Sequence, residues 1–377
     1  MRRIAYVSGS RADYGLMRET LRRIDADDRL QLTVFATGMH LMEEFGNSIE
    51  LIRQDGFSTQ EIPLSFESDR PEATATFLGQ LIVTLTQKFR EERPDIIMLL
   101  GDRAEMLAAA CVATYLNIPI AHIHGGDLSK TADEHARHAI TKLAHLHFPA
   151  TSLSAQRIRR MGEEEWRITV TGSPGVATIH DNETIPKAEL YRTYDLSEEK
   201  PFLLMLQHPV DAESAGEEID RTLDAIENIG MQTVVIYPNA DAGGRAMIKR
   251  IEARNSQLVK TEKNVDYTTF LSLLANAAAL VGNSSAGIIE APSFKLPVVN
   301  IGRRQEGRER AINVIDCESK TTKIEKAIRK AISDSFKEEM KQCVNPYYHE
   351  DTFSRITEKL ATTSLGRQLI EKVFDDG

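Results

Sequence analysis

The chain has 377 residues, of which 41% are hydrophobic and 27% charged, and its formal net charge at pH 7 is −10. This length and composition predict a folded protein of two domains and exclude a largely disordered chain. The acidic balance argues against nucleic acid and anionic membranes as partners, because the surface as a whole repels them. An anionic substrate would have to be held by a local group of positive charges.

The first half of the chain alternates short apolar runs with longer amphipathic ones. Strands are predicted at residues 4–8, 32–37, 95–100, 118–123 and 146–150. Helices are predicted at about residues 14–25, 41–54, 72–92, 104–116 and 134–144. Apolar runs such as IIMLL are typical of parallel strands covered on both faces. The alternation therefore predicts a doubly wound α/β sheet.

The second half repeats this pattern after an interruption at residues 168–176, where Gly172 and Gly175 flank Ser173 and Pro174. This segment is the predicted hinge. Strands are then predicted at residues 202–206, 233–237, 279–281 and 298–301. Helices are predicted at residues 213–228, 245–254, 267–275 and 323–333, and a long one at 352–373. Two such domains predict a binding cleft between them, because doubly wound sheets bind ligands at the carboxyl ends of their strands.

The cysteines and the N-terminus indicate the compartment. Cys111, Cys317 and Cys343 are far apart and odd in number, which is typical of a reducing compartment and not of a disulfide framework. The first residues contain too short an apolar run for a signal peptide, and no stretch approaches the ~20 apolar residues of a membrane span. We therefore expect a cytoplasmic protein.

Polar residues follow two of the strands predicted in the first half. Gly9, Ser10 and Arg11 come directly after the first strand. A glycine beside a helix start can bind phosphate through backbone N–H groups, and Arg11 would add a charged donor. The alternative is a helix cap with Arg11 paired at the surface. Asp102 opens the helix after strand 95–100, where a carboxylate suits proton transfer, hydroxyl recognition or capping.

Six of the ten histidines lie between residues 122 and 147. His122 and His124 share one face of a predicted strand, which would permit an HxH metal pair. However, Gly125 and Gly126 follow at once, which favours close approach of a ligand to the backbone. No metal site is predicted.

The second half contains a pattern typical of nucleotide binding. His208 follows a strand and is suited to donate to a phosphate or to act as an acid, although loop packing is the alternative. A glycine-rich run with Ser284 and Ser285 lies between a strand and a helix and predicts a phosphate-binding nest. Glu290, further along that helix, is placed to accept both hydroxyls of a ribose; the alternative is a solvent-facing side chain. Arg308 belongs to a basic loop that would supply positive charge.

In an ordered set of motifs the chain resembles the hydrolysing UDP-N-acetylglucosamine 2-epimerases of sialic and related nonulosonic acid biosynthesis. The motifs are GSRADYG, ATGMHL, LGDRAE, HIHGGD, ARHAITKLAHLHF, LQHPV and GNSSAGIIEAPSF, and they span about residues 3–315. The resemblance implies a glycosyltransferase-B-like fold of two Rossmann-like domains facing a cleft. Residues 1–171 and 352–377 would form the catalytic domain, with the C-terminal helix crossing back to it, and residues 172–351 the UDP-binding domain.

The resemblance also implies a reaction that needs no metal and no cofactor. UDP is eliminated from UDP-N-acetylglucosamine across C1–C2 to give a glycal, and water adds with inversion at C2, which releases N-acetylmannosamine. Such chemistry needs a base for the C2 proton, a donor to the departing diphosphate and an acid/base for the water. By motif match the catalytic residues are Asp102, His124, Asp133 and His208. The implied substrate-binding residues are Arg11, Arg137, Ser284, Ser285, Gly287, Glu290 and Arg308.

One position departs from the family pattern. Many members have HIEGGE where this chain has HIHGGD, so His124 replaces a presumed catalytic glutamate. Either His124 transfers the proton, since an imidazole is a competent base near neutral pH, or Asp127 or Asp133 does so. The same departure leaves the identity of the substrate's sugar open.

Three alternatives to this function follow. The substrate is a nucleotide-linked 2,4-diacetamido-trideoxyhexose of a legionaminic-type pathway, or the enzyme is a non-hydrolysing epimerase that returns the nucleotide sugar. The third alternative is a retaining glycosyltransferase of the same fold or a catalytically silent nucleotide-sugar sensor. The family resemblance also suggests a homodimer or a homotetramer.

Overall fold

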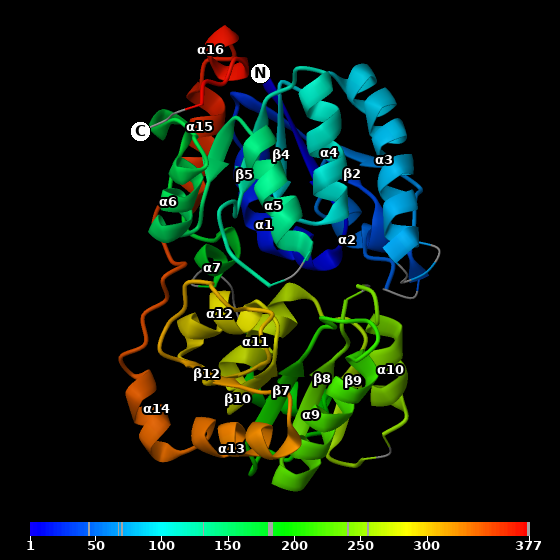
Figure 1. The fold of residues 1–377 in the computed structure, drawn as a ribbon, viewed down its shortest axis with the longest axis vertical. Helices are drawn as coiled ribbons and strands as arrows, with labels where there is room; N and C mark the ends of the chain where they lie inside the picture. The colour runs from blue at the N-terminus through cyan, green and yellow to red at the C-terminus, as the bar shows by residue number, and fades with distance from the viewer. Residues whose placement is uncertain are drawn as a thin grey trace. The chain divides into compact units, whose positions relative to one another are not determined.

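The computed structural model describes residues 1–43, 46–66, 68, 71–130, 132–179, 184–239, 241–254 and 256–374. These residues form two compact units (Figure 1). The first unit is built from Met1–Ser68, Glu72–Thr178 and the C-terminal segment that begins at Tyr347. The second unit is built from Ile179–Pro346.

The first unit contains a parallel six-stranded sheet with the strand order β3-β2-β1-β4-β5-β6. Its strands are β1 (Arg2–Ser8), β2 (Leu30–Ala36), β3 (Thr59–Glu61), β4 (Ile96–Leu100), β5 (Ile120–Ile123) and β6 (Leu146–Phe148). Its longer helices are α1 (Arg11–Asp25), α3 (Pro71–Glu92), α4 (Ala104–Tyr115), α5 (Ala132–Leu143), α6 (Ser152–Arg160) and α15 (Thr352–Thr362). Shorter ones are η1 (Gly38–Leu41), α2 (Ile49–Gln54), η3 (Glu165–Arg167), α7 (Pro174–Thr178) and α16 (Arg367–Ile370).

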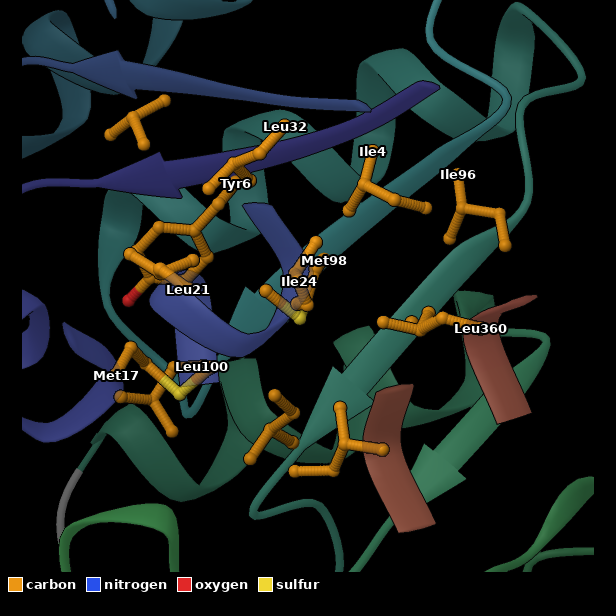
Figure 2. Close-up of a cluster of buried hydrophobic side chains, with 14 of the residues drawn as sticks. Ile4, Tyr6, Met17, Leu21, Ile24, Leu32, Ile96, Met98, Leu100 and Leu360 are labelled. Atoms are coloured by element: carbon orange, nitrogen blue, oxygen red, sulfur yellow. The ribbon is translucent and has the colours of Figure 1, made fainter. Parts of the chain in front are cut away.

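Both faces of this sheet are buried, because alternate residues of each strand point to opposite sides. Ile4 and Tyr6 of β1 pack with Met17 and Leu21 of α1 on one face, as Figure 2 shows. Leu360 of α15 joins the same cluster, so the C-terminal helix returns to the first unit. Burying one such leucine contributes ~1.5–3 kcal/mol. The opposite face is covered by α3, α4 and α5.

The second unit has the same construction, with the strand order β12-β11-β10-β7-β8-β9 and all strands parallel. Its strands are β7 (Phe202–Leu206), β8 (Gln232–Ile236), β9 (Val259–Glu262), β10 (Ala279–Gly282), β11 (Val298–Ile301) and β12 (Val314–Cys317). Its helices are α8 (Lys187–Thr193), α9 (Ala215–Ile229), α10 (Gly244–Glu252), α11 (Tyr267–Asn276), α12 (Ala286–Ile289), η4 (Ala291–Phe294), α13 (Thr321–Ala331) and α14 (Asp334–Met340). Helices α9, α10 and α13 cover one face, and α8 and α11 cover the other.

The predicted fold class of two doubly wound α/β sheets with a returning C-terminal helix is confirmed. Two helix predictions were wrong in extent. The helix expected at residues 41–54 begins only at Ile49, because Gly46 and Asn47 have left-handed backbones with φ of 86° and 42°; residues 44 and 45 lie outside the described ranges. The helix expected at 352–373 ends at Thr362, and α16 starts after Gly366, whose extended backbone interrupts the helix.

No helix within the described part of the chain is long and apolar enough to cross a membrane.

Candidate active site

The first turn of α1 is capped from within the protein. The Asp13 carboxylate accepts hydrogen bonds from the backbone N–H groups of Ser10 (2.7 Å) and Gly9 (3.1 Å), and Ser10 Oγ accepts one from Asp13 N (3.3 Å). Burial raises the pKa of Asp13, although hydrogen bonds from Ser8 and Ser10 and the charge of Arg103 act in the opposite direction. These two amides therefore serve the helix cap, which favours the capping interpretation over phosphate binding at Gly9 and Ser10. Arg11 is half-buried at the first position of α1.

Asp102 lies in the turn after β4 and is ion-paired with Arg137 of α5. The Arg137 side chain is buried, and its Nη1 donates to the Asp127 carbonyl (2.8 Å) while Nη2 also donates to Ser129 Oγ (3.3 Å). Burial alone would lower the pKa of Arg137, but the carboxylates of Asp102, Asp127 and Asp133 raise it above its ordinary value. The arginine is therefore a permanent cation whose partners are protein groups.

The two histidines of the HIH motif have different environments. His122 is fully buried; its Nε2 donates to the Gly101 carbonyl (2.8 Å), and its Nδ1 lies 3.2 Å from Thr141 Oγ1. Burial lowers its pKa to about 3, so it is neutral at physiological pH. His124 follows the end of β5, is half-buried and has a left-handed backbone with φ of 63°. Such a conformation is rare outside glycine and is concentrated at functional sites.

Because both ring nitrogens of His122 face protein groups, this residue does not form the metal pair that its spacing permits. Among the described residues, no group of three or more histidine, cysteine or acidic side chains is arranged to hold a metal ion.

The two further carboxylates of this region differ in accessibility. Asp127 is buried and its Oδ1 accepts a hydrogen bond from Ser154 Oγ of α6 (2.6 Å). Asp133 is half-buried in the first turn of α5, close enough to Arg137 to raise the pKa of that arginine. Of the two carboxylates offered as substitutes for His124, Asp133 is the more accessible.

Glu105 was not predicted as a site residue. It is fully buried in the first turn of α4, and its Oε2 accepts from Arg103 Nε at 3.3 Å. Its Oε1 has no hydrogen-bond partner within the described part of the chain. Gly9 and Gly38 make room for it, since a methyl group at these positions would lie 2.3 and 2.9 Å from Oε1. The sequence signal was an acidic residue two positions after Arg103, on the buried side of a helix.

In the second unit, His208 follows β7 and is held by two asparagines. The backbone N–H of His208 donates to Asn283 Oδ1 (2.7 Å), and Asn283 Nδ2 donates to the His208 carbonyl (2.8 Å). The backbone N–H of Asn239 donates to His208 Nδ1 (3.2 Å). A neutral His208 therefore carries its proton on Nε2, which makes that nitrogen a donor.

The glycine-rich segment after β10 depends on close backbone contacts. Gly282 has φ of 143°, and a methyl group there would lie 2.0 Å from the Leu206 carbonyl oxygen. At Gly287 a methyl group would lie 2.7 Å from Val298 Cγ1, so this glycine lets α12 pack against β11. Both glycines thus have a structural function in the segment.

Ser284, Ser285 and Glu290 lie together around α12. Ser284 Oγ accepts from the N–H of Ala286 (3.3 Å), and Ser285 is half-buried at the helix start. Glu290 is 4% exposed, so the solvent-facing alternative for this side chain was wrong. Burial raises its pKa to about 7, while the nearby charge of Arg308 acts in the opposite direction. A carboxyl group buried beside a phosphate-type nest is a candidate acceptor for ligand hydroxyls.

Comparisons with known proteins show which family the chain is similar to. A family model described as UDP-N-acetylglucosamine 2-epimerase matches residues 22–361. The UDP-N,N'-diacetylbacillosamine 2-epimerase (hydrolyzing) of Legionella pneumophila is 39% identical over 376 residues, which cover 99% of each chain. The GDP/UDP-N,N'-diacetylbacillosamine 2-epimerase (hydrolyzing) of Campylobacter jejuni is 33% identical over 346 residues, which cover 89% of each.

The fold also matches a solved structure. The crystal structure of the Neisseria meningitidis UDP-GlcNAc 2-epimerase bound to UDP-GlcNAc superposes with a TM-score of 0.81 at 19% identity, covering 96% of this chain and 100% of that one.

Proposed function

Since the chain belongs to the UDP-N-acetylglucosamine 2-epimerase family, we propose that it is a hydrolysing 2-epimerase of a UDP-linked 2-acetamido sugar. The observation that carries this proposal is the Asp102 carboxylate, held at the carboxyl end of β4 against the buried cation of Arg137. The ion pair fixes the direction of the carboxylate and favours its ionised form, and only the ionised form can accept a proton from carbon. No cofactor is required for the reaction.

The reaction has two halves. In the first, a base removes the C2 proton, the C1–O bond to the diphosphate breaks and a glycal forms as UDP leaves. In the second, water adds across the double bond: hydroxide goes to C1, and a proton goes to C2 on the face opposite to the one deprotonated. The net change is hydrolysis of the nucleotide sugar with inversion at C2. Removal of the C2 proton from one face and its return to the opposite face require two acid/base groups.

We assign Asp102 as the base of the first half, because Arg137 favours its ionised form. His124 and Asp133 are the candidates for the second group, and both are half-buried. His208 donates from Nε2 to the leaving diphosphate, because its Nδ1 is occupied as an acceptor. A donor that stabilises the charge developing on the leaving group lowers the barrier to elimination.

The nucleotide belongs to the second unit in this proposal. Ser284 and Ser285 bind phosphate, and the Glu290 carboxylate accepts the ribose hydroxyls. Arg308 supplies positive charge that the protein as a whole, at −10, lacks. Gly287 contributes by permitting the packing of α12 rather than by touching the ligand.

For the sugar we favour a 2,4-diacetamido-trideoxyhexose, the chemistry named for both relatives above. UDP-N-acetylglucosamine, which the motifs and the family description favour, is the second candidate. The two sugars differ at C4, where an acetamido group replaces a hydroxyl, and at C6, which lacks its hydroxyl in the first. Discrimination requires only a few polar contacts at these positions.

The test is proton and phosphorus NMR in deuterated water with each nucleotide sugar. We expect UDP to accumulate together with the free C2-inverted sugar carrying deuterium at C2, and a higher kcat/KM for the diacetamido substrate. Asp102→Asn should abolish turnover but keep UDP binding, which separates catalysis from recognition. A nucleotide-linked epimer as the lasting product would place the enzyme in the non-hydrolysing branch. UDP binding without turnover of either sugar would contradict the proposal.

A further inference from the structure

Helix α5 holds the turn after β4 at two points. Arg137 forms an ion pair with the Asp102 carboxylate. One helical turn later, the Thr141 hydroxyl lies 3.2 Å from His122 Nδ1, and His122 Nε2 donates to the Gly101 carbonyl (2.8 Å). Residues four apart lie on the same face of a helix. One face of α5 therefore contacts the Asp102 side chain directly and reaches the Gly101 carbonyl through His122.

The absence of a side chain at Gly125 leaves room for His122 and Thr141 to meet. A methyl group at Gly125 would lie 2.9 Å from both His122 Nδ1 and Thr141 Oγ1. Arg137 is 2% exposed and Thr141 and His122 are fully buried, whereas Asp102 is partly exposed, so water reaches the ion pair only from the side of the carboxylate. A buried guanidinium is costly unless it is paired and hydrogen-bonded. Asp102 provides the charge that offsets this cost.

The same helix face continues to Asp133, one of the two candidates for the second acid/base group. Asp133 lies four residues before Arg137, in the first turn of α5. Since a helix is rigid over this length, α5 sets the position of Asp133 relative to the group that holds Asp102.

We propose that Arg137 is a positioning residue that acts through Asp102, with Thr141 and His122 as its structural support, and that it does not contact the substrate. This assignment replaces the substrate-binding role expected for Arg137 from the motif. It rests on the proposed function of Asp102 as a base. The arginine fixes the direction of the carboxylate and favours its ionised form.

A change in charge at this position has a measurable consequence. Among the described residues, the charged and titratable groups coupled to Arg137 include the carboxylates of Asp102, Asp127 and Asp133, neutral His122 behind the turn, and His138 of the same helix, whose pKa is lowered by burial and by Arg137. Without the guanidinium, the protonated form of Asp102 is favoured. The acid limb of the pH profile of kcat/KM should then move to higher pH by about one to three units.

The experiment compares Arg137→Gln, Arg137→Lys and Thr141→Val. Arg137→Gln should lower kcat and shift the acid limb, with KM nearly unchanged. Arg137→Lys keeps the charge but loses the forked geometry, so kcat should fall about tenfold with a smaller shift of the limb. Thr141→Val removes a hydroxyl and no charge, and should lower kcat without moving the limb.

Arg157→Gln is the matched control. Arg157 donates to the Gly126 carbonyl (3.1 Å) and so supports the same loop from α6, with a backbone carbonyl as its partner. Its removal should leave the acid limb in place. A higher KM with an unmoved limb in Arg137→Gln would mean that the arginine binds substrate, and would overturn the proposal.

A second measurement does not depend on turnover. In protein labelled with ¹³C-carboxyl aspartate, the Asp102 signal, assigned by its loss in Asp102→Asn, should titrate at higher pH in Arg137→Gln than in the wild type. If Arg137→Gln does not fold, Arg137→Lys should show the same direction with a smaller shift. An unchanged titration in folded variants would refute the positioning role. Failure of wild-type turnover with the expected titration would instead refute the proposed function alone.

Discussion

Substitution of Glu290 should change two quantities that can be measured separately, the pH dependence of stability and the affinity for UDP. The side chain is 4% exposed, and burial raises its pKa from 4.5 to about 7, with Arg308 acting in the opposite direction. Between these two pH values the folded state binds more protons than the unfolded state. The stability contributed by the protonated carboxyl is therefore complete below pH 4.5 and is lost as the pH rises through 7.

The size of this effect follows from the shift. A shift from 4.5 to about 7 corresponds to roughly 3 kcal/mol, most of which is lost between pH 5 and pH 8. The substitution Glu290→Gln removes the ionisation and nearly preserves the shape. Any effect of the glutamine amide itself on the free energy of unfolding is independent of pH, so it cancels when the two pH values are compared. The free energy of unfolding of the variant, relative to the wild type, should thus be about 2–3 kcal/mol higher at pH 8 than at pH 5.

The assay is urea denaturation at both pH values, followed at the transition of the second unit, with UDP titrations by calorimetry. UDP affinity should fall about ten- to a hundredfold in Glu290→Gln, since a carboxylate acceptor for the ribose hydroxyls is lost. Glu318→Gln, at an exposed carboxylate of the same unit paired with Lys320, should change neither quantity appreciably. An equal change in stability at pH 5 and pH 8 would refute the inference that Glu290 is buried in its protonated form.

Three further substitutions test the structure. Gly282→Ala should destabilise the second unit by more than ~3 kcal/mol in urea denaturation, because its methyl group would lie 2.0 Å from a carbonyl oxygen. Gly302→Ala, with open space around it, should cost only the ~1–2 kcal/mol of its left-handed backbone. Equal costs for the two substitutions would contradict the close contact at Gly282. Asn283→Ala should lower the free energy of unfolding by about 2–3 kcal/mol, because both main-chain hydrogen bonds to His208 are lost. It should also weaken UDP binding in calorimetry. An unchanged affinity would argue against a phosphate contact at His208. Arg167→Met should speed hydrogen exchange in α16 and lower the free energy of unfolding by about 3 kcal/mol, because the buried guanidinium donates to two carbonyls of that segment (2.8 and 2.9 Å). Amides of α16 that stay protected in the variant would contradict this.

Much of the fold was predictable because buried strands have a clear sequence signature. The strands expected at 202–206 and 298–301 coincide with β7 and β11, which are apolar along their whole length. Three of the four edge strands, β3, β9 and β12, were not predicted. Their sequences, TQE, VKTE and VIDC, include polar residues and are only partly buried, since an edge strand has a neighbour on one side only.

Part of the site was also readable from local spacing. The carboxyl ends of β4 and β7 place Asp102 and His208 where the alternation of strands and helices predicted them. The spacing of Ser10 and Asp13 is that of a capping box, and it contained the signal that these amides would serve the helix.

The sequence by itself determined the class of fold, the family and the positions of polar residues at strand ends, because these depend on short-range periodicity and on ordered motifs. Only the tertiary structure decided which groups become partners. Arg137 meets Asp102 from 35 residues away because the parallel order of β4 and β5 brings α5 over the turn after β4. Periodicity reports which face of a helix is buried. Long-range packing selects the neighbour, and thereby the charge and protonation of each candidate site residue.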